Sequence, residues 1–175
     1  MRNRQCIKKF AESKGLTFGT GSTFVTFVTT DGSSRTFHDS GKFEKKRDST
    51  LVSQGTWQCD GADNYFVWEG NKKYSSRTNL SATMNTIFNC VKEELESRYM
   101  KFEFTANELK LLFPRDKQHW SFYEDGKWGK FNTEDNSPVM IDGKPTVGTW
   151  ECDGEEEYKV LTEWGIYNSK LNSWT

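Results

Sequence analysis

The segment Gly55-Thr56-Trp57-Gln58-Cys59-Asp60-Gly61 occurs a second time, with one substitution, as Gly148-Thr149-Trp150-Glu151-Cys152-Asp153-Gly154. The agreement continues downstream in the same register, where Tyr65, Val67 and Tyr74 match Tyr158, Val160 and Tyr167. Self-similarity of this kind indicates an internal duplication. We therefore interpret the chain as two copies, residues 1–76 and 85–175, joined by a linker over residues 77–84.

Two further matches lie upstream of this segment. Asp31-Gly32 matches Asp125-Gly126, and Cys6–Lys14 matches Cys90–Arg98, but the two matches differ in register. The difference predicts an insertion of about ten residues in the second copy, between residues 99 and 120.

Each copy begins with a helical pattern and continues with β patterns. Cys6, Ile7, Phe10 and Ala11 fall on one helical face, and residues 84–95 carry a similar apolar stripe. The segments that follow are β-branched and aromatic, and turn signals such as Asp31-Gly32 separate them. The sequence thus predicts an α+β tandem repeat, in which each copy has one helix and an antiparallel β-meander of about four to five strands.

The four cysteines lie two in each copy, at matching places. Of the three pairings that four cysteines allow, only Cys6–Cys59 with Cys90–Cys152 treats the copies alike. Such bridges favour an extracellular or virion location, whereas four free thiols would place the protein in the cytoplasm. No C-x-x-C pair occurs and His38 and His119 are not equivalent, so we expect neither a metal site nor a cofactor.

Composition excludes several classes of protein. The 175 residues carry 24 basic and 25 acidic side chains, a net charge of −1, which supplies no general field for nucleic acid. The one basic cluster, Lys42–Arg47, is interrupted by Glu44 and is interpreted as a solvated loop. No apolar run is long enough for a membrane span, and the first residues lead into no apolar segment, so we expect no signal peptide.

Catalytic motifs are scarce. No nucleophile elbow or phosphate-binding loop occurs, and His38 and His119 are interpreted as surface or turn residues. Asp60 and Asp153 each precede a glycine, a position where aspartate stabilises turns. We expect no enzymatic activity; the alternative is a glycan hydrolase that acts through Asp153, Glu151 or their counterparts, since such enzymes need only two carboxylates.

Aromatic residues are the most unusual feature, with 7 Trp, 6 Tyr and 13 Phe. Trp57 and Trp150 recur in both copies, and we expect them to pack on the bridges. Tryptophans that do not recur are predicted to be exposed stacking platforms for a ligand, because packing alone would have kept them in both copies. These candidate ligand-binding residues are Trp68, Trp120, Trp128, Trp164 and Trp174.

The pattern Trp120-x-Phe122-Tyr123-x-Asp125-Gly126, followed by Gly148 to Gly154, resembles small lipocalin-like β-meander modules and is similar to repeat modules of bacterial-surface and phage-particle proteins. A true lipocalin closes eight strands around a ligand cavity. The resemblance assigns no functional residue.

From these features we expect a non-catalytic binding or adhesion module that presents an aromatic β-surface to a glycan or a protein. An oligomer or larger assembly is compatible with this expectation. A structural component of a virion is the alternative besides the hydrolase.

Overall fold

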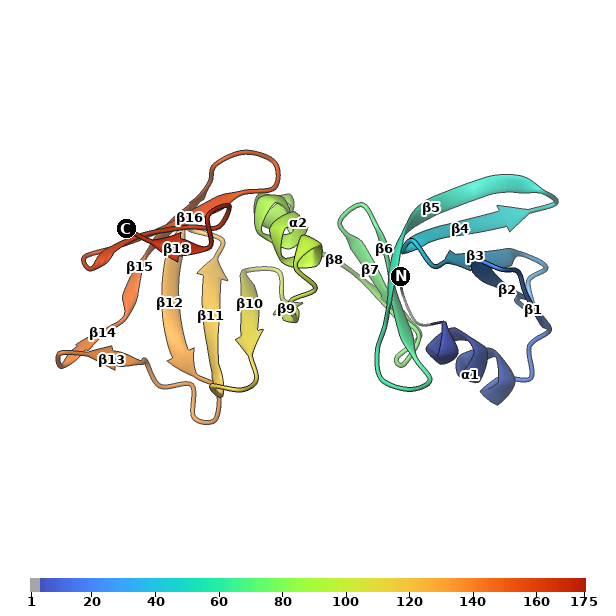
Figure 1. Ribbon diagram of the computed structural model, residues 1–175, viewed down its shortest axis with the longest axis horizontal. Helices are drawn as coiled ribbons and strands as arrows, with labels where there is room; N and C mark the ends of the chain where they lie inside the picture. The colour runs from blue at the N-terminus through green and yellow to red at the C-terminus, as the bar shows by residue number, and fades with distance from the viewer. Residues whose placement is uncertain (1–3) are drawn as a thin grey trace. The chain divides into compact units, whose positions relative to one another are not determined.

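The computed structural model describes residues 4–175, which form two compact units that divide after Thr83. The described chain is 49% strand and 12% helical, with two large antiparallel sheets (Figure 1). The expected α+β class, a tandem repeat of one helix and four to five strands, was therefore wrong. The fold is mostly β, because each of the two large sheets has eight strands and each α-helix has only nine residues.

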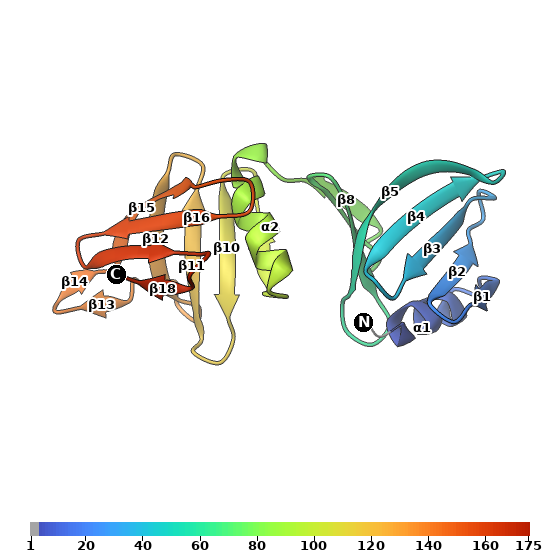
Figure 2. The ribbon, with the colours of Figure 1, turned by 45° about the horizontal axis from the view of Figure 1, so that its top comes forward.

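The first unit has one helix and an uninterrupted meander in which every strand pairs with the next in sequence. Its sheet is strongly curved, and the helix lies on the concave side (Figure 2). The elements in chain order are α1 (Gln5–Ser13), β1 (Phe18–Thr20), β2 (Phe24–Val28), β3 (Ser34–His38), β4 (Lys42–Arg47), β5 (Thr50–Cys59), β6 (Tyr65–Glu69), β7 (Lys72–Ser75) and β8 (Leu80–Thr83).

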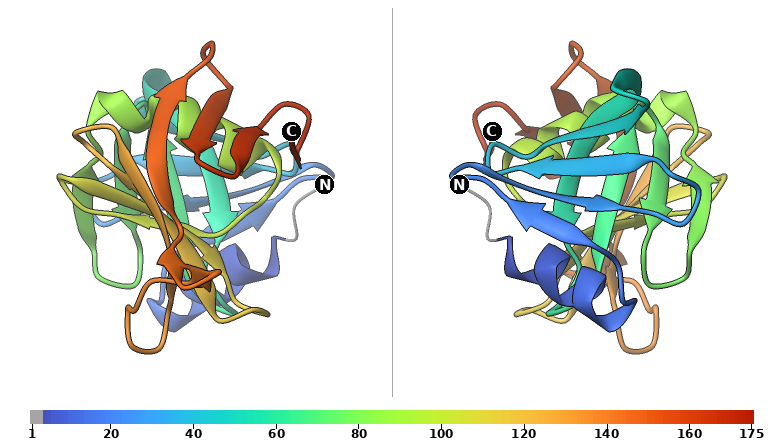
Figure 3. Two further views of the ribbon diagram at one scale, coloured as in Figure 1. Left: turned by 90° about the vertical axis from the view of Figure 1, so that its left-hand side faces the viewer. Right: turned by 90° about the vertical axis from the view of Figure 1, so that its right-hand side faces the viewer.

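The second unit departs from a plain meander at one place. A small hairpin, β13 (Met140–Ile141) and β14 (Lys144–Pro145), is not part of the large sheet (Figure 3). In the chain it lies between β12 and β15, which pair directly with each other. The other elements are η1 (Thr86–Phe88), α2 (Asn89–Ser97), β9 (Phe102–Phe104), β10 (Glu108–Phe113), β11 (Gln118–Tyr123), β12 (Lys127–Asn132), β15 (Val147–Cys152), β16 (Tyr158–Thr162), β17 (Gly165–Asn168) and β18 (Ser173–Trp174).

The core of each unit is built on matching aromatic contacts. In the first unit the Phe37 ring lies edge-on to Trp57 and Tyr65, at centroid distances of 5.7 and 4.9 Å. In the second, Phe122 makes the same contacts with Trp150 and Tyr158, at 5.7 and 5.1 Å. Phe122 is therefore the counterpart of Phe37, and β11 is the counterpart of β3.

The insertion that was expected between residues 99 and 120 lies elsewhere in the chain. The backbone N–H of Trp57 donates to the Gly41 carbonyl, and that of Trp150 donates to the Gly126 carbonyl, so Gly126 corresponds to Gly41 and not to Gly32. The additional residues of the second unit lie instead between β12 and β15, where hairpin β13–β14 is found. Any tight hairpin favours Asp-Gly, and the match of Asp31-Gly32 with Asp125-Gly126 was a coincidence of turn chemistry.

The first glycine of the recurring segment is fixed by close backbone approach. A Cβ atom on Gly55 would lie 1.7 Å from the Trp68 carbonyl oxygen, and one on Gly148 would lie 2.0 Å from that of Leu161. Both distances are far shorter than a van der Waals contact. Only glycine therefore allows the backbones of β5 and β6, or of β15 and β16, to approach this closely.

The expected linker over residues 77–84 also differs from the structure. Residues 80–83 form β8, which pairs with β7 so that Ser81 lies opposite Tyr74. The boundary between the two units falls after Thr83.

Candidate functional site

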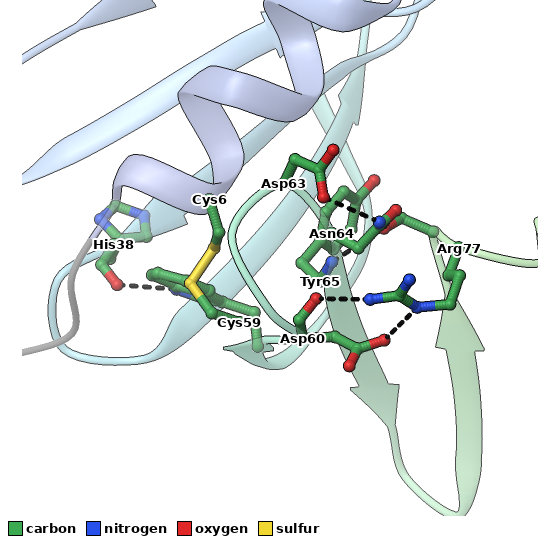
Figure 4. The surroundings of a disulfide bond; sticks show 10 residues. Cys6, His38, Cys59, Asp60, Asp63, Asn64, Tyr65 and Arg77 are labelled. Atoms are coloured by element: carbon green, nitrogen blue, oxygen red, sulfur yellow. Dashed lines mark hydrogen bonds and ion pairs between the residues drawn. A yellow bond between two sulfur atoms is a disulfide. The ribbon is translucent and has the colours of Figure 1, made fainter.

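Both predicted disulfides are formed. Cys6, on α1, is bonded to Cys59 at the end of β5, and Cys90, on α2, is bonded to Cys152, with Cα atoms 5.9 Å apart in each pair. Figure 4 shows the first bridge together with the loop that follows β5. No cysteine in the described residues is free. Two such bridges are typical of a protein that resides in an oxidising environment.

The carboxylates considered for glycan hydrolysis have structural partners. The Arg77 guanidinium lies 3.2 Å from the Asp60 carboxylate and also donates to the Asp60 carbonyl (Figure 4). Asp153 lies 3.3 Å from the Lys159 ammonium, and Glu151 is exposed. Asp60 and Asp153 belong to different units. Each aspartate thus holds a loop in place, and the expectation of a non-enzyme stays a prediction.

The predicted aromatic platforms are only partly present. Trp68, Trp120 and Trp128 are buried, with exposed fractions of 3%, 8% and 1%, so the prediction was wrong for these three. Trp164 and Trp174 are exposed. The expected aromatic surface for a glycan or protein therefore rests on two rings, and that use of them stays a prediction.

The tryptophans of the second unit that have no counterpart in the first unit pack against one another. Trp120 lies 5.2 Å from Trp128, 5.1 Å from Tyr167 and 6.1 Å from Trp174, measured between ring centroids. Trp174 also lies 5.4 Å from Tyr167. These rings fill the sheet face that continues from the core residue Phe122.

The corresponding face of the first unit is hollow. It holds a cavity of about 190 Å³ between strands β3 to β8. Its walls come from strands distant in sequence, and include apolar, cationic and hydroxyl-bearing side chains. The lining residues are Arg35, Phe43, Lys45, Tyr65, Val67, Glu69, Lys72, Tyr74 and Ser81.

Strand register identifies which residue replaces which. Arg35 lies opposite Lys45, and Trp120 lies opposite Lys130, so Trp120 occupies the position of Arg35. In the same way Phe37 pairs with Phe43 and Phe122 with Trp128, while Tyr74 pairs with Ser81 and Tyr167 with Trp174. Three tryptophans in the second unit thus stand where the first unit has Arg35, Phe43 and Ser81.

The cavity is cationic and contains buried polar atoms. Arg35, Lys45 and Lys72 face one carboxylate, Glu69. The Tyr65 hydroxyl and Nε of Arg35 are buried, and the Arg35 side chain interacts with the Tyr65 hydroxyl. Burial, chiefly, together with neighbouring Tyr74 raises the pKa of Tyr65 above its usual value, although nearby Arg35 opposes this shift. The Tyr65 hydroxyl therefore stays protonated.

None of the cavity residues was predicted as a site. Lys42–Arg47 was interpreted as a solvated loop, but it is strand β4, whose residues Phe43 and Lys45 line the cavity. The available signal was the contrast between copies, since the second copy has tryptophans where the first has arginine, phenylalanine and serine. That contrast can be recognised only when the strand register shows which residues of the two copies correspond.

His119 is not the surface or turn residue that was expected. It is buried on β11, stacks on Phe131 at 5.5 Å, and its Nδ1 lies 3.2 Å from the Thr133 hydroxyl. Burial and then Lys110 lower its pKa below 6.5, although Glu108 opposes the shift. His38, on β3, is half-buried, with its Nε2 2.7 Å from the Glu44 carboxylate.

The depressed pKa of His119 predicts that acid weakens the second unit. As pH falls through about 6.5, the unfolded chain binds a proton at His119 that the folded chain does not, so the free energy of unfolding falls. His119→Gln cannot titrate, and we expect a smaller loss of stability than in the wild type between about pH 7 and pH 5. Urea unfolding at several pH values measures this difference; equal losses in both proteins would contradict the assignment.

Residues 4–175 contain no group of three or more His, Cys, Asp or Glu side chains that could hold a metal ion. A membrane-spanning helix is likewise absent from this range, where the two α-helices have nine residues each. No protein-family model matches the chain, and no curated protein matches it.

Proposed function

We propose that this chain is a non-catalytic binding protein whose first unit takes up a small molecule in the Arg35–Tyr65 cavity. The observation that carries the proposal is the contrast between the two units. The same sheet face is packed with three tryptophans in one unit and hollow in the other. An open pocket of about 190 Å³, lined by side chains of five strands, thus stands where the second unit has packed rings.

The chemistry of the walls supports binding rather than catalysis. The lining combines the apolar side chains Phe43 and Val67 with charged ones such as Arg35, so the cavity can contact an apolar group and a polar group of one small molecule. The lipocalin-like resemblance is compatible with this proposal, since lipocalins hold ligands within eight strands. We extend the proposal to location: an extracellular or virion protein would keep both disulfides oxidised.

Fragment binding followed by NMR tests the proposal. Fragments of roughly ten non-hydrogen atoms or fewer should bind in a cavity of this size. We expect them to shift the methyl resonances of Val67, which lines the cavity, and to leave those of its counterpart Val160 unchanged. Val160 is a matched internal control, because it is fully buried against the tryptophan-filled face.

A variant that closes the cavity provides the second arm. Ser81→Trp places in the first unit the residue that Trp174 provides in the second, and Ser81 is exposed, so the larger side chain can be accommodated. We expect this variant to fold and to lose the Val67 shifts. Fragment binding that survives the substitution, or a wild type in which no fragment moves Val67, would refute the proposed function.

A further inference from the structure

The geometry points to a small organic acid as the ligand: a carboxylate head held by Arg35 and Lys45, with an apolar body the size of one ring or a short chain. This inference rests on the proposed function, because it names the ligand class of the same cavity. The placement of charge, the Arg35 guanidinium and the size of the apolar floor support this ligand class.

Two cations lie side by side in the cavity wall. Arg35 on β3 lies directly opposite Lys45 on β4, both side chains are half-buried, and both line the cavity. Like charges directly opposite one another destabilise a β-sheet. Lys72 adds a third cation, whereas Glu69 is the one carboxylate in the wall. An anion within the cavity would offset the repulsion between Arg35 and Lys45.

The counterpart position supports this interpretation. In the second unit Trp120 lies opposite Lys130, so no pair of like charges arises there. The sheet therefore does not require two cations at this place in the ladder. Their occurrence in the unit with the cavity, and not in the filled one, ties them to the cavity's contents.

The Arg35 guanidinium has the geometry to bind a carboxylate. The Arg35 side chain is half-buried and lines the cavity, and it interacts with the buried hydroxyl of Tyr65, which helps to fix the guanidinium in place. A carboxylate is an acceptor with two oxygens that match the guanidinium fork. A neutral amide offers only one such oxygen and no charge.

The cavity volume limits the size of the apolar part of the ligand. Phe43 and Val67 supply an apolar floor, each with 3% of its surface exposed. An apolar cavity of about 150 Å³ accommodates benzene. The volume of about 190 Å³ therefore suits one ring, or a chain of similar size, together with a carboxylate.

Calorimetric titration of the full oxidised chain tests the inference. The probes are benzoate and hexanoate, with benzamide and hexanamide as neutral counterparts of the same shape. We expect the acids to bind at least about tenfold more tightly than the amides, the scale of one charge-assisted contact. Arg35→Met, which keeps an unbranched apolar stem, should remove this difference and leave amide binding in place.

Two further variants provide a second test and a control. Lys45→Met should also reduce the preference for acids, and it serves if Arg35→Met fails to fold. Lys130→Met, at the counterpart position in the filled unit, is the matched control and should leave the preference unchanged.

The outcomes separate the ligand class from the proposed function. Acids and amides that bind equally well, and that are both lost in Ser81→Trp, would overturn the organic-acid assignment while supporting a small-molecule site. A preference for acids that persists in both Arg35→Met and Lys45→Met would overturn the assignment as well. Absence of binding by all four probes would overturn it, and the fragment shifts at Val67 then decide whether the proposed function also fails.

Discussion

Replacing Cys6 and Cys59 together by alanine is expected to lower the free energy of unfolding of the first unit by about 4 kcal/mol. The bridge joins the first turn of α1 to the end of β5 across 53 residues. In the chain-entropy description, a loop of this length strongly restricts the unfolded chain, so its release favours unfolding. The loss is a large fraction of the stability of a small domain.

The second bridge provides a matched comparison. Cys90 and Cys152 close 62 residues, so their joint replacement by alanine should cost the second unit a similar amount. Denaturant-dependent hydrogen exchange, followed by mass spectrometry of peptides from each unit, reports the two effects separately. A loss below about 1 kcal/mol in either unit would show that the bridge contributes little beyond the noncovalent packing.

The helices and bridges could be predicted because they follow from local pattern. Cys6, Ile7, Phe10 and Ala11 recur at helical spacing, and all four are buried on α1. The disulfides follow once one cysteine is placed on the helix and one on the recurring strand of each copy. Neither prediction required knowledge of which strands are neighbours.

The number of strands could not be predicted in the same way. Strand β8 has no buried residue and β4 has one, Phe43, so neither shows the alternation of a half-buried strand. These segments are strands because their backbone groups pair with β7, β3 and β5. Pairing of that kind depends on the rest of the sheet and leaves little trace in the side chains. For this reason the sequence predicted too few strands, and with them the α+β class with four to five strands per copy.

The candidate site was missed for a related reason. Tryptophans without a counterpart were interpreted as exposed, on the premise that packing residues recur in both copies. The premise fails at Trp120 and Trp128, which are buried because the second unit packs shut a face that the first unit leaves hollow. Divergence between the copies marked a difference in the packing of this face, and most residues that line the proposed site are polar, such as Arg35.

The other large effect is expected at Trp128, the most buried of the tryptophans that fill the second unit. Trp128→Ala should lower the free energy of unfolding of this unit by about 3–5 kcal/mol, because it removes a large ring from a closely packed cluster. Trp128 lies 5.2 Å from Trp120 and 6.2 Å from Trp174, so both neighbours would lose contacts. Urea unfolding measured by tryptophan fluorescence and circular dichroism gives the magnitude.

Trp128→Phe is the matched variant, because phenylalanine is the residue at the counterpart position, Phe43. It keeps most of the buried apolar surface and also removes an indole N–H that has no hydrogen-bond partner in residues 4–175. We therefore expect a clearly smaller loss than for Trp128→Ala. Equal losses would mean that the second unit needs the indole itself and not simply a filled face. The contrast between a filled and a hollow sheet, on which the proposed ligand site depends, would then lose its physical basis.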